Sequence, residues 1–116
     1  MNALMNLTPH PIKILNLDET VMIAPSGMIA RVVETPVGAG EVVTVLVDGY
    51  KKKVTITAAM HKGVKDLPDP VDGIQFIVSR PVTLAARGRD DLLVPDDFVR
   101  NEVGEIMGCR TLRRML

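Results

Sequence analysis

Cysteine and aromatic residues are scarce in this chain of 116 residues. Cys109 is the single cysteine, which excludes a disulfide within the chain and favours a reducing compartment. Aromatic residues make up 3% of the sequence, so valine, isoleucine, leucine and methionine must fill the core. No apolar run approaches the roughly 20 residues of a membrane span. Residues 1–17 also lack the basic start and the apolar stretch of a secretory signal peptide, so a cytoplasmic location is predicted.

An excess of either charge is missing as well. The 14 basic and 14 acidic residues cancel, and this balance does not call for nucleic acid or an anionic membrane as a partner. The two basic residue types are nevertheless segregated. All six lysines lie between Lys13 and Lys65, whereas seven of the eight arginines lie between Arg80 and Arg114. The planar guanidinium group suits bidentate recognition of anions, so the second half of the chain is the better place to look for an anion site.

The sequence offers little catalytic apparatus. It contains no Gly-x-Ser-x-Gly, no His-Glu-x-x-His and no phosphate-binding P-loop motif. His10, His61 and Cys109 do not have the spacing of a zinc site, and the aspartates of residues 66–72 do not match a calcium-binding loop. We therefore predict no catalytic residues, no metal and no cofactor. Turnover by His10 or Cys109 stays open as an alternative.

Short apolar runs, separated by turn residues, predict a mainly β fold that is α+β at the margin. The expected architecture is a small antiparallel sheet or barrel, with seven to eight short strands and one short helix near residues 81–87. Asp48-Gly49 is a favoured hairpin dipeptide. The expected strands are residues 12–17, 20–24, 28–34, 41–47, 51–57, 74–78, 92–94 and 105–112.

The remaining segments are expected to be irregular. Residues 36–40 contain proline and two glycines and predict a loop. Residues 58–64 fit either a helical turn or a loop, and Asp96-Asp97 could cap another helical turn. Residues 1–116 are predicted to form one domain, in which residues 1–5 are a flexible or swapped tail. Because a small, strand-rich chain has exposed strand edges, a homo-oligomer is also expected.

The sequence pattern is organised around residues 74–95, where two apolar runs bracket a charged loop and a short helix. Ser79 ends the first run, and Arg80 and Arg89 lie on either side of the helix. Arginine forks at a strand end suit a phosphate or a carboxylate, and His10 could add a donor if the N-terminal strand lies alongside. The alternative is that these arginines pair with the aspartates of residues 90–97 and fix the loop.

Four short motifs resemble those of a group of small proteins from phages, prophages and bacteria. They are Asn-Leu-Thr-Pro-His at residues 6–10, Ile-Val-Ser-Arg at 77–80, Arg-Asp-Asp-Leu-Leu-Val-Pro at 89–95 and Gly-Cys-Arg at 108–110. The resemblance extends over most of the chain, except residues 36–65. No established activity is attached to the group.

The resemblance implies a phage-type binding protein in the cytoplasm of a bacterial host. The leading hypothesis is the capture of an anionic small molecule, such as a nucleotide-derived signal of host defence, without catalysis. The alternative is a phage structural or host-takeover protein that binds another protein. The residues expected to bind the small molecule are Thr8, His10, Ser79, Arg80, Arg89 and Asp91.

Overall fold

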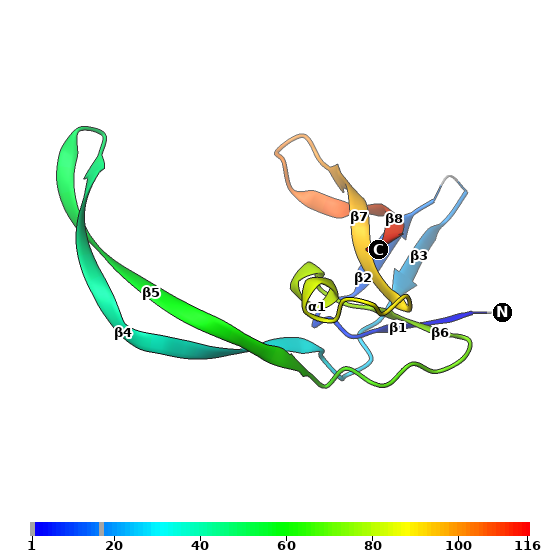
Figure 1. The fold of residues 1–116 in the computed structure, drawn as a ribbon. Coiled ribbons are helices and arrows are strands. Elements are labelled where there is room, and N and C mark those ends of the chain that lie inside the picture. The colour runs from blue at the N-terminus through cyan, green and yellow to red at the C-terminus, as the bar shows by residue number, and fades with distance from the viewer. Residues whose placement is uncertain (1, 17) are drawn as a thin grey trace.

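The computed structural model describes residues 2–16 and 18–116 and consists mainly of β-strands (Figure 1). The mainly β class is therefore confirmed, with one short helix in the expected region. In chain order the elements are β1 (Ala3–Asn6), β2 (Ile12–Leu15), β3 (Thr20–Ile23), β4 (Arg31–Val47), β5 (Tyr50–Lys65), β6 (Ile74–Ile77), α1 (Arg80–Ala85), β7 (Leu92–Arg100) and β8 (Ile106–Arg114).

Six strands form one sheet, in the order β1-β6-β7-β8-β2-β3. This sheet is mixed rather than purely antiparallel. Strands β1 and β7 both run parallel to β6, and β2 runs parallel to β8, whereas β7–β8 and β2–β3 are antiparallel. A parallel neighbour requires a crossover connection, and α1 provides it between β6 and β7. The strand–helix–strand pattern of residues 74–95 was thus the signal for parallel pairing.

The core lies on both faces of this sheet. Phe76 and Ile77 are adjacent in β6 and fully buried, and they belong to separate clusters because neighbouring strand residues point to opposite faces. The cluster around Phe76 packs under α1 and includes Leu7, Ala30, Val78, Val82, Leu92 and Val94. The cluster around Ile77 comprises Ile12, Ile14 and Cys109. Aliphatic side chains thus dominate the core, as the scarcity of aromatic residues requires.

Strands β4 and β5 pair only with one another and form a long ribbon that leaves the rest of the molecule (Figure 1). The ribbon explains the radius of gyration of 18.5 Å, compared with about 13 Å for a compact domain of this length. Its turn is Asp48-Gly49, and both residues have positive φ, as a tight hairpin turn requires. The predicted hairpin is therefore confirmed, but its strands are far longer than expected.

The ribbon also corrects two predictions of irregular structure. Residues 36–40 lie within β4, where Pro36 pairs with Ala59, and residues 58–64 lie within β5. The register shifts between Val37 and Glu41, so that residues 38–40 oppose Thr57 alone. Proline and glycine are tolerated here because a bulge absorbs the extra residues and each strand of a two-stranded ribbon has a free edge.

Two further predictions differ from the structure. Residues 3–5, expected to belong to a flexible or swapped tail of residues 1–5, lie in β1 and pair with β6, while Met1 lies outside the described residues. Asp96 and Asp97 lie within β7 instead of capping a helical turn, and Asp96 pairs in register with Thr111. In both cases pairing with a neighbouring strand decides the conformation: β6 lies far from β1 in the sequence, whereas β8 follows β7 after a short turn.

Gly108 allows β8 to approach β2 closely, and we expect Gly108→Ala to lower the free energy of unfolding by about 2 kcal/mol. A Cβ atom on Gly108 would lie 2.8 Å from the carbonyl oxygen of Lys13, which is backbone and cannot rotate away. Equilibrium urea unfolding measures the loss. Thr111→Ala, an exposed change on the same strand, serves as the control and should cost less than about 0.5 kcal/mol. Equal stabilities of the two variants would contradict the close approach.

Candidate functional site

Four of the six residues expected to bind a ligand line one pocket, which we call the His10 pocket. Thr8 and His10 come from the loop after β1, and Ser79 and Arg80 come from the junction of β6 and α1. The pocket has a volume of about 420 Å³. Its other lining residues are largely apolar and comprise Pro9, Ile12, Val78, Val94, Pro95 and Phe98. Apolar walls with a few convergent polar groups are typical of small-molecule sites.

Parallel pairing of β1 and β6 brings the two segments together. Both strands end at the same edge of the sheet, so the chain after Asn6 and the chain after Ile77 emerge side by side. The backbone N–H of Leu7 donates to the carbonyl of Ile77 at 2.8 Å and extends this pairing. The N-terminal strand therefore lies alongside, which was the condition for His10 to approach Ser79 and Arg80.

Asn6 fixes the shape of the loop that carries Thr8 and His10. Its side chain is buried, with 1% of the residue exposed. The amide nitrogen donates to the carbonyl oxygens of His10 at 2.8 Å and Ile23 at 3.1 Å. The amide oxygen accepts from the backbone N–H of Thr8 at 2.9 Å and from its hydroxyl at 2.6 Å. The Thr8 hydroxyl is thus engaged in the loop, so Thr8 shapes the pocket wall.

Ser79 and Arg80 present polar groups at the other side of the pocket. Ser79 has an extended backbone and precedes α1, but its side chain makes no capping hydrogen bond to the helix. Arg80 is 52% exposed at its side chain, and its Nη2 lies 3.6 Å from Oδ1 of Asp96. The other oxygen of Asp96 pairs with Nη2 of Arg113 at 2.6 Å. Two guanidinium groups share one carboxylate, which leaves a local excess of positive charge.

Arg89 and Asp91 do not line the His10 pocket and bind each other instead. Nε and Nη2 of Arg89 donate to the two oxygens of Asp91, each at 2.8 Å. Nη2 also donates to the carbonyl of Pro68 at 2.9 Å. The hydrogen bond from Arg89 lowers the pKa of Asp91 below its ordinary value, against the opposing effect of burial. This pair connects the loop before β7 to residues 66–72. For Arg89, this is the alternative in which the arginines pair with aspartates and fix the loop.

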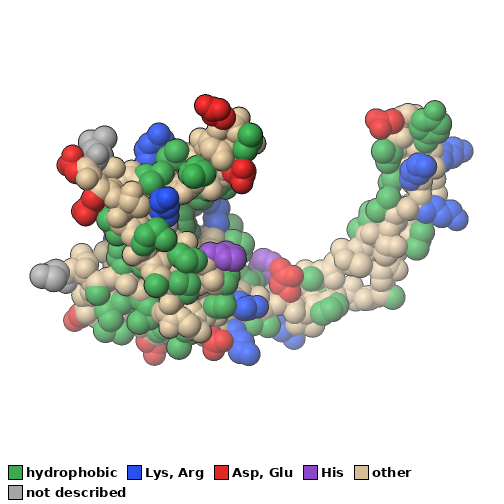
Figure 2. Space-filling view, turned by 180° about the vertical axis from the view of Figure 1, so that it is seen from behind, with side chains coloured by type: hydrophobic (Ala, Val, Ile, Leu, Met, Phe, Trp, Pro, Cys, Tyr) green, Lys and Arg blue, Asp and Glu red, His purple; other side chains and the backbone are tan. Residues whose placement is uncertain are grey.

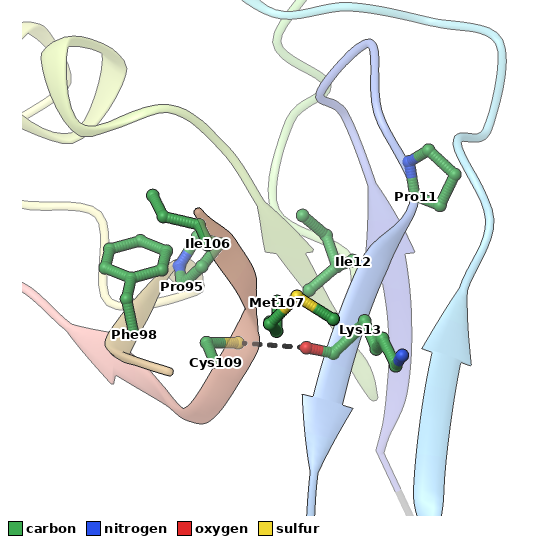
Figure 3. A pocket seen from close by; sticks show the side chains of 9 residues that line it. Pro11, Ile12, Lys13, Pro95, Phe98, Ile106, Met107 and Cys109 are labelled. Atoms are coloured by element: carbon green, nitrogen blue, oxygen red, sulfur yellow. Dashed lines mark hydrogen bonds between the residues drawn. The ribbon is translucent and has the colours of Figure 1, made fainter. Parts of the chain in front are cut away.

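Phe98 is a pocket residue that the sequence did not single out. Its side chain projects from β7, and the residue is 47% exposed although it is one of only two phenylalanines. It lines the His10 pocket and also an adjacent pocket of about 210 Å³. Figure 3 shows Phe98 and Ile106 on one side of this second pocket and Ile12 across from them on β2. An aromatic residue in a charged stretch, Asp-Asp-Phe-Val-Arg, was the available signal.

Cys109 is poorly suited to nucleophilic chemistry. It lines the second pocket but is 2% exposed, and its Sγ donates to the carbonyl of Lys13 at 3.6 Å (Figure 3). Burial raises the pKa of the thiol, which keeps it protonated. Within residues 2–16 and 18–116, no three His, Cys, Asp or Glu side chains gather in an arrangement that could hold a metal ion. The same residues include no helix long and apolar enough to cross a membrane.

Comparison with known proteins does not identify a family for this chain. No family model matches the chain, and neither a curated protein nor a solved structure matches it. The functional argument therefore depends on the residues of the pocket.

Proposed function

We propose that this chain is a small binding protein that captures an anionic small molecule of nucleotide type in the His10 pocket, without catalysis. One observation carries the proposal. Two segments about 70 residues apart, at residues 8–10 and 79–80, converge on one largely apolar pocket whose lining includes the half-exposed guanidinium group of Arg80. A nucleotide combines a flat apolar ring with a phosphate, so it needs both features at once.

The pocket divides naturally between the two parts of such a ligand. Arg80 would pair with the phosphate, and the free hydroxyl of Ser79 and the exposed ring of His10 would orient it. Phe98 would stack on the ring, since a half-exposed aromatic side chain offers a flat apolar face. When Arg80 turns to the phosphate, Asp96 would keep its contact with Arg113. Arg89 and Asp91 would act indirectly, by holding the loop before β7.

The biological setting of the proposal comes from the resemblance to phage and prophage proteins. A captured nucleotide-type signal of host defence fits a non-catalytic protein in the bacterial cytoplasm that acts by sequestration. The expectation of a homo-oligomer also belongs here, since the long ribbon leaves strand edges and apolar side chains exposed.

The same exposed ribbon favours one alternative, a phage structural or host-takeover protein whose ligand is another protein. Exposed strands recruit partners by adding a strand or by packing a face. Copurification of one host or virion protein at a fixed stoichiometry, with no small molecule bound, would favour this function over the first.

Native mass spectrometry of the protein from bacteria with active nucleotide-based defence tests the proposal directly. A stoichiometric bound mass, identified after denaturing release, would name the ligand class. A nucleotide panel in a thermal unfolding assay then gives affinity, because a ligand at 100 times its dissociation constant stabilises by about 2.7 kcal/mol. A bare protein that no nucleotide stabilises would contradict the proposal.

Arg80→Ala is expected to weaken binding of the identified nucleotide by about tenfold to hundredfold, because one charge-assisted contact to phosphate is lost. Isothermal titration calorimetry measures the change. Arg110→Ala is the matched control, because Arg110 is an exposed arginine, 3.5 Å from Asp97, that does not line the pocket. Wild-type affinity in both Arg80→Ala and Phe98→Ala would show that the ligand binds elsewhere.

A further inference from the structure

The outer half of the β4–β5 ribbon has an apolar face that no other part of the described chain covers. Residues paired directly across the ribbon share a face, and so do alternate residues of one strand. The pairs Glu41–Ile56, Val43–Val54, Val45–Lys52 and Val47–Tyr50 therefore define one side, which we call the valine face. Six of its eight side chains are apolar. The opposite side, the lysine face, has the pairs Val42–Thr55, Thr44–Lys53 and Leu46–Lys51.

The valine face is exposed to solvent. Tyr50 is 70% exposed, Ile56 53% and Val54 42%. No residue between 33 and 63 is buried, and the outer half of the ribbon stands well away from the rest of the molecule (Figure 2). An isolated two-stranded ribbon is marginally stable in water at best. Val32 and Val64 pack on the core at the base of the ribbon, so a partner is needed for its outer half.

The charges on the valine face indicate what the partner is. Glu41 lies at the end nearer the bulge, and Lys52 lies nearer the tip. The Val43–Val54 pair lies midway between the level of Glu41 and the level of Lys52. A second ribbon, turned by 180° about an axis through this midpoint, would bring its Glu41 to the level of Lys52, and its Lys52 to the level of Glu41. The face is therefore complementary to itself.

We propose that two copies of this chain associate through their valine faces, with the ribbons packed antiparallel about Val43 and Val54. The apolar side chains of the two faces cover one another, as in the packing of two sheets. Lys52 of each copy pairs with Glu41 of the other at the two ends of the contact. A parallel arrangement is disfavoured because it would place Lys52 at the level of Lys52 and Glu41 at the level of Glu41. The resulting interface is isologous, as a two-fold dimer requires.

This association does not depend on the proposed ligand, because no residue of the valine face lines the His10 pocket. Sedimentation velocity of the full chain over a range of concentrations tests it. The wild-type chain is expected to sediment as a dimer. Val54→Asp is expected to give monomers, whereas Thr55→Asp, on the neighbouring residue and the opposite face, should leave the oligomer unchanged.

Exchange of the two charges provides the sharper test. Lys52→Glu and Glu41→Lys should each weaken the association about tenfold or more, because each places like charges at the same level. The double variant Glu41→Lys/Lys52→Glu should restore it, which a variant that merely unfolded could not do. Lys53→Glu, on the lysine face, is the matched control and should associate like the wild-type chain. A wild-type monomer at all concentrations, an oligomer that survives Val54→Asp, or a double variant as weak as the single ones would overturn the proposal.

Discussion

Asn6→Ala is expected to lower the free energy of unfolding by about 4 kcal/mol, although it removes only one small polar side chain. The truncation removes the Asn6 partner of the Ile23 carbonyl and of the Thr8 N–H, and leaves the His10 carbonyl only the Thr8 hydroxyl at 3.1 Å. Each buried polar group without a hydrogen bond costs about 1–3 kcal/mol, because it lost its water on folding. Equilibrium unfolding in urea, followed by circular dichroism, measures the difference.

Two further substitutions show whether hydrogen bonding is the cause. Asn6→Asp keeps the shape and an acceptor for Thr8, but it replaces both donated hydrogen bonds by contact between a carboxylate and two carbonyls. It should therefore be at least as harmful as alanine near neutral pH. Asn101→Ala is the exposed counterpart, because the Asn101 side chain also accepts two backbone hydrogen bonds in a turn. Its loss should cost about 1 kcal/mol, since water replaces the bonds there. A stable Asn6→Asp variant would contradict the argument.

The Asn6 network explains why the Asn-Leu-Thr-Pro-His motif could be recognised but not interpreted from the sequence. Thr8 and His10 were placed near a ligand because of the resemblance to phage proteins, and His10 also because it could add a hydrogen-bond donor. The structure shows that the Asn6 side chain accepts hydrogen bonds from the backbone and hydroxyl of Thr8, while Thr8, Pro9 and His10 all line the pocket. The partner of Asn6 across the fold, Ile23, lies 17 residues away, and no local pattern indicates it.

The strands were predictable where alternation of apolar residues was strong and turns were well marked. Asp48-Gly49 is an example, because the dipeptide alone specifies the positive φ angles of the tight turn. The length of the ribbon was not predictable from the same signals. Pro36 and Gly38 break local patterns, and only the bulge opposite Thr57 lets the pairing continue past them. The sequence also does not show that β4 and β5 pair only with each other, because the order of strands in a sheet depends on the whole fold.

Convergence of the pocket residues was foreseen as a possibility, and its cause lies in the strand order. Ser79 and Arg80 follow β6, and the loop with His10 follows β1, so their proximity requires these two strands to be parallel neighbours. A sheet assumed to be antiparallel does not place both segments at one edge. For the arginines, the sequence left ligand binding and pairing with aspartate open. Arg89 pairs closely with Asp91 at 2.8 Å, whereas Arg80 stays half exposed and makes a longer contact of 3.6 Å with Asp96.

Arg89→Ala is expected to destabilise the protein by about 3 kcal/mol at neutral pH, because it leaves a largely buried carboxylate without its partner. The Arg89 and Asp91 side chains are 20% and 12% exposed. The truncation also removes the donor to the Pro68 carbonyl, which frees residues 66–72 from the loop before β7. Arg110→Ala, which removes an exposed ion pair, is the control and should change stability by less than about 1 kcal/mol.

The pH dependence of this loss identifies the ion pair as its source. Because the pKa of Asp91 is lower in the folded wild-type chain than in the unfolded one, the pair stabilises the fold above the ordinary carboxylate pKa of 3.8. That contribution disappears as the pH falls through the lowered pKa of the folded state. The difference in unfolding free energy between the wild-type and Arg89→Ala proteins should thus be largest near neutral pH. It should shrink progressively as the pH falls below the ordinary carboxylate pKa. Urea unfolding of both proteins along an acid series measures it, and a difference that stays constant would assign the loss to packing of the arginine side chain instead.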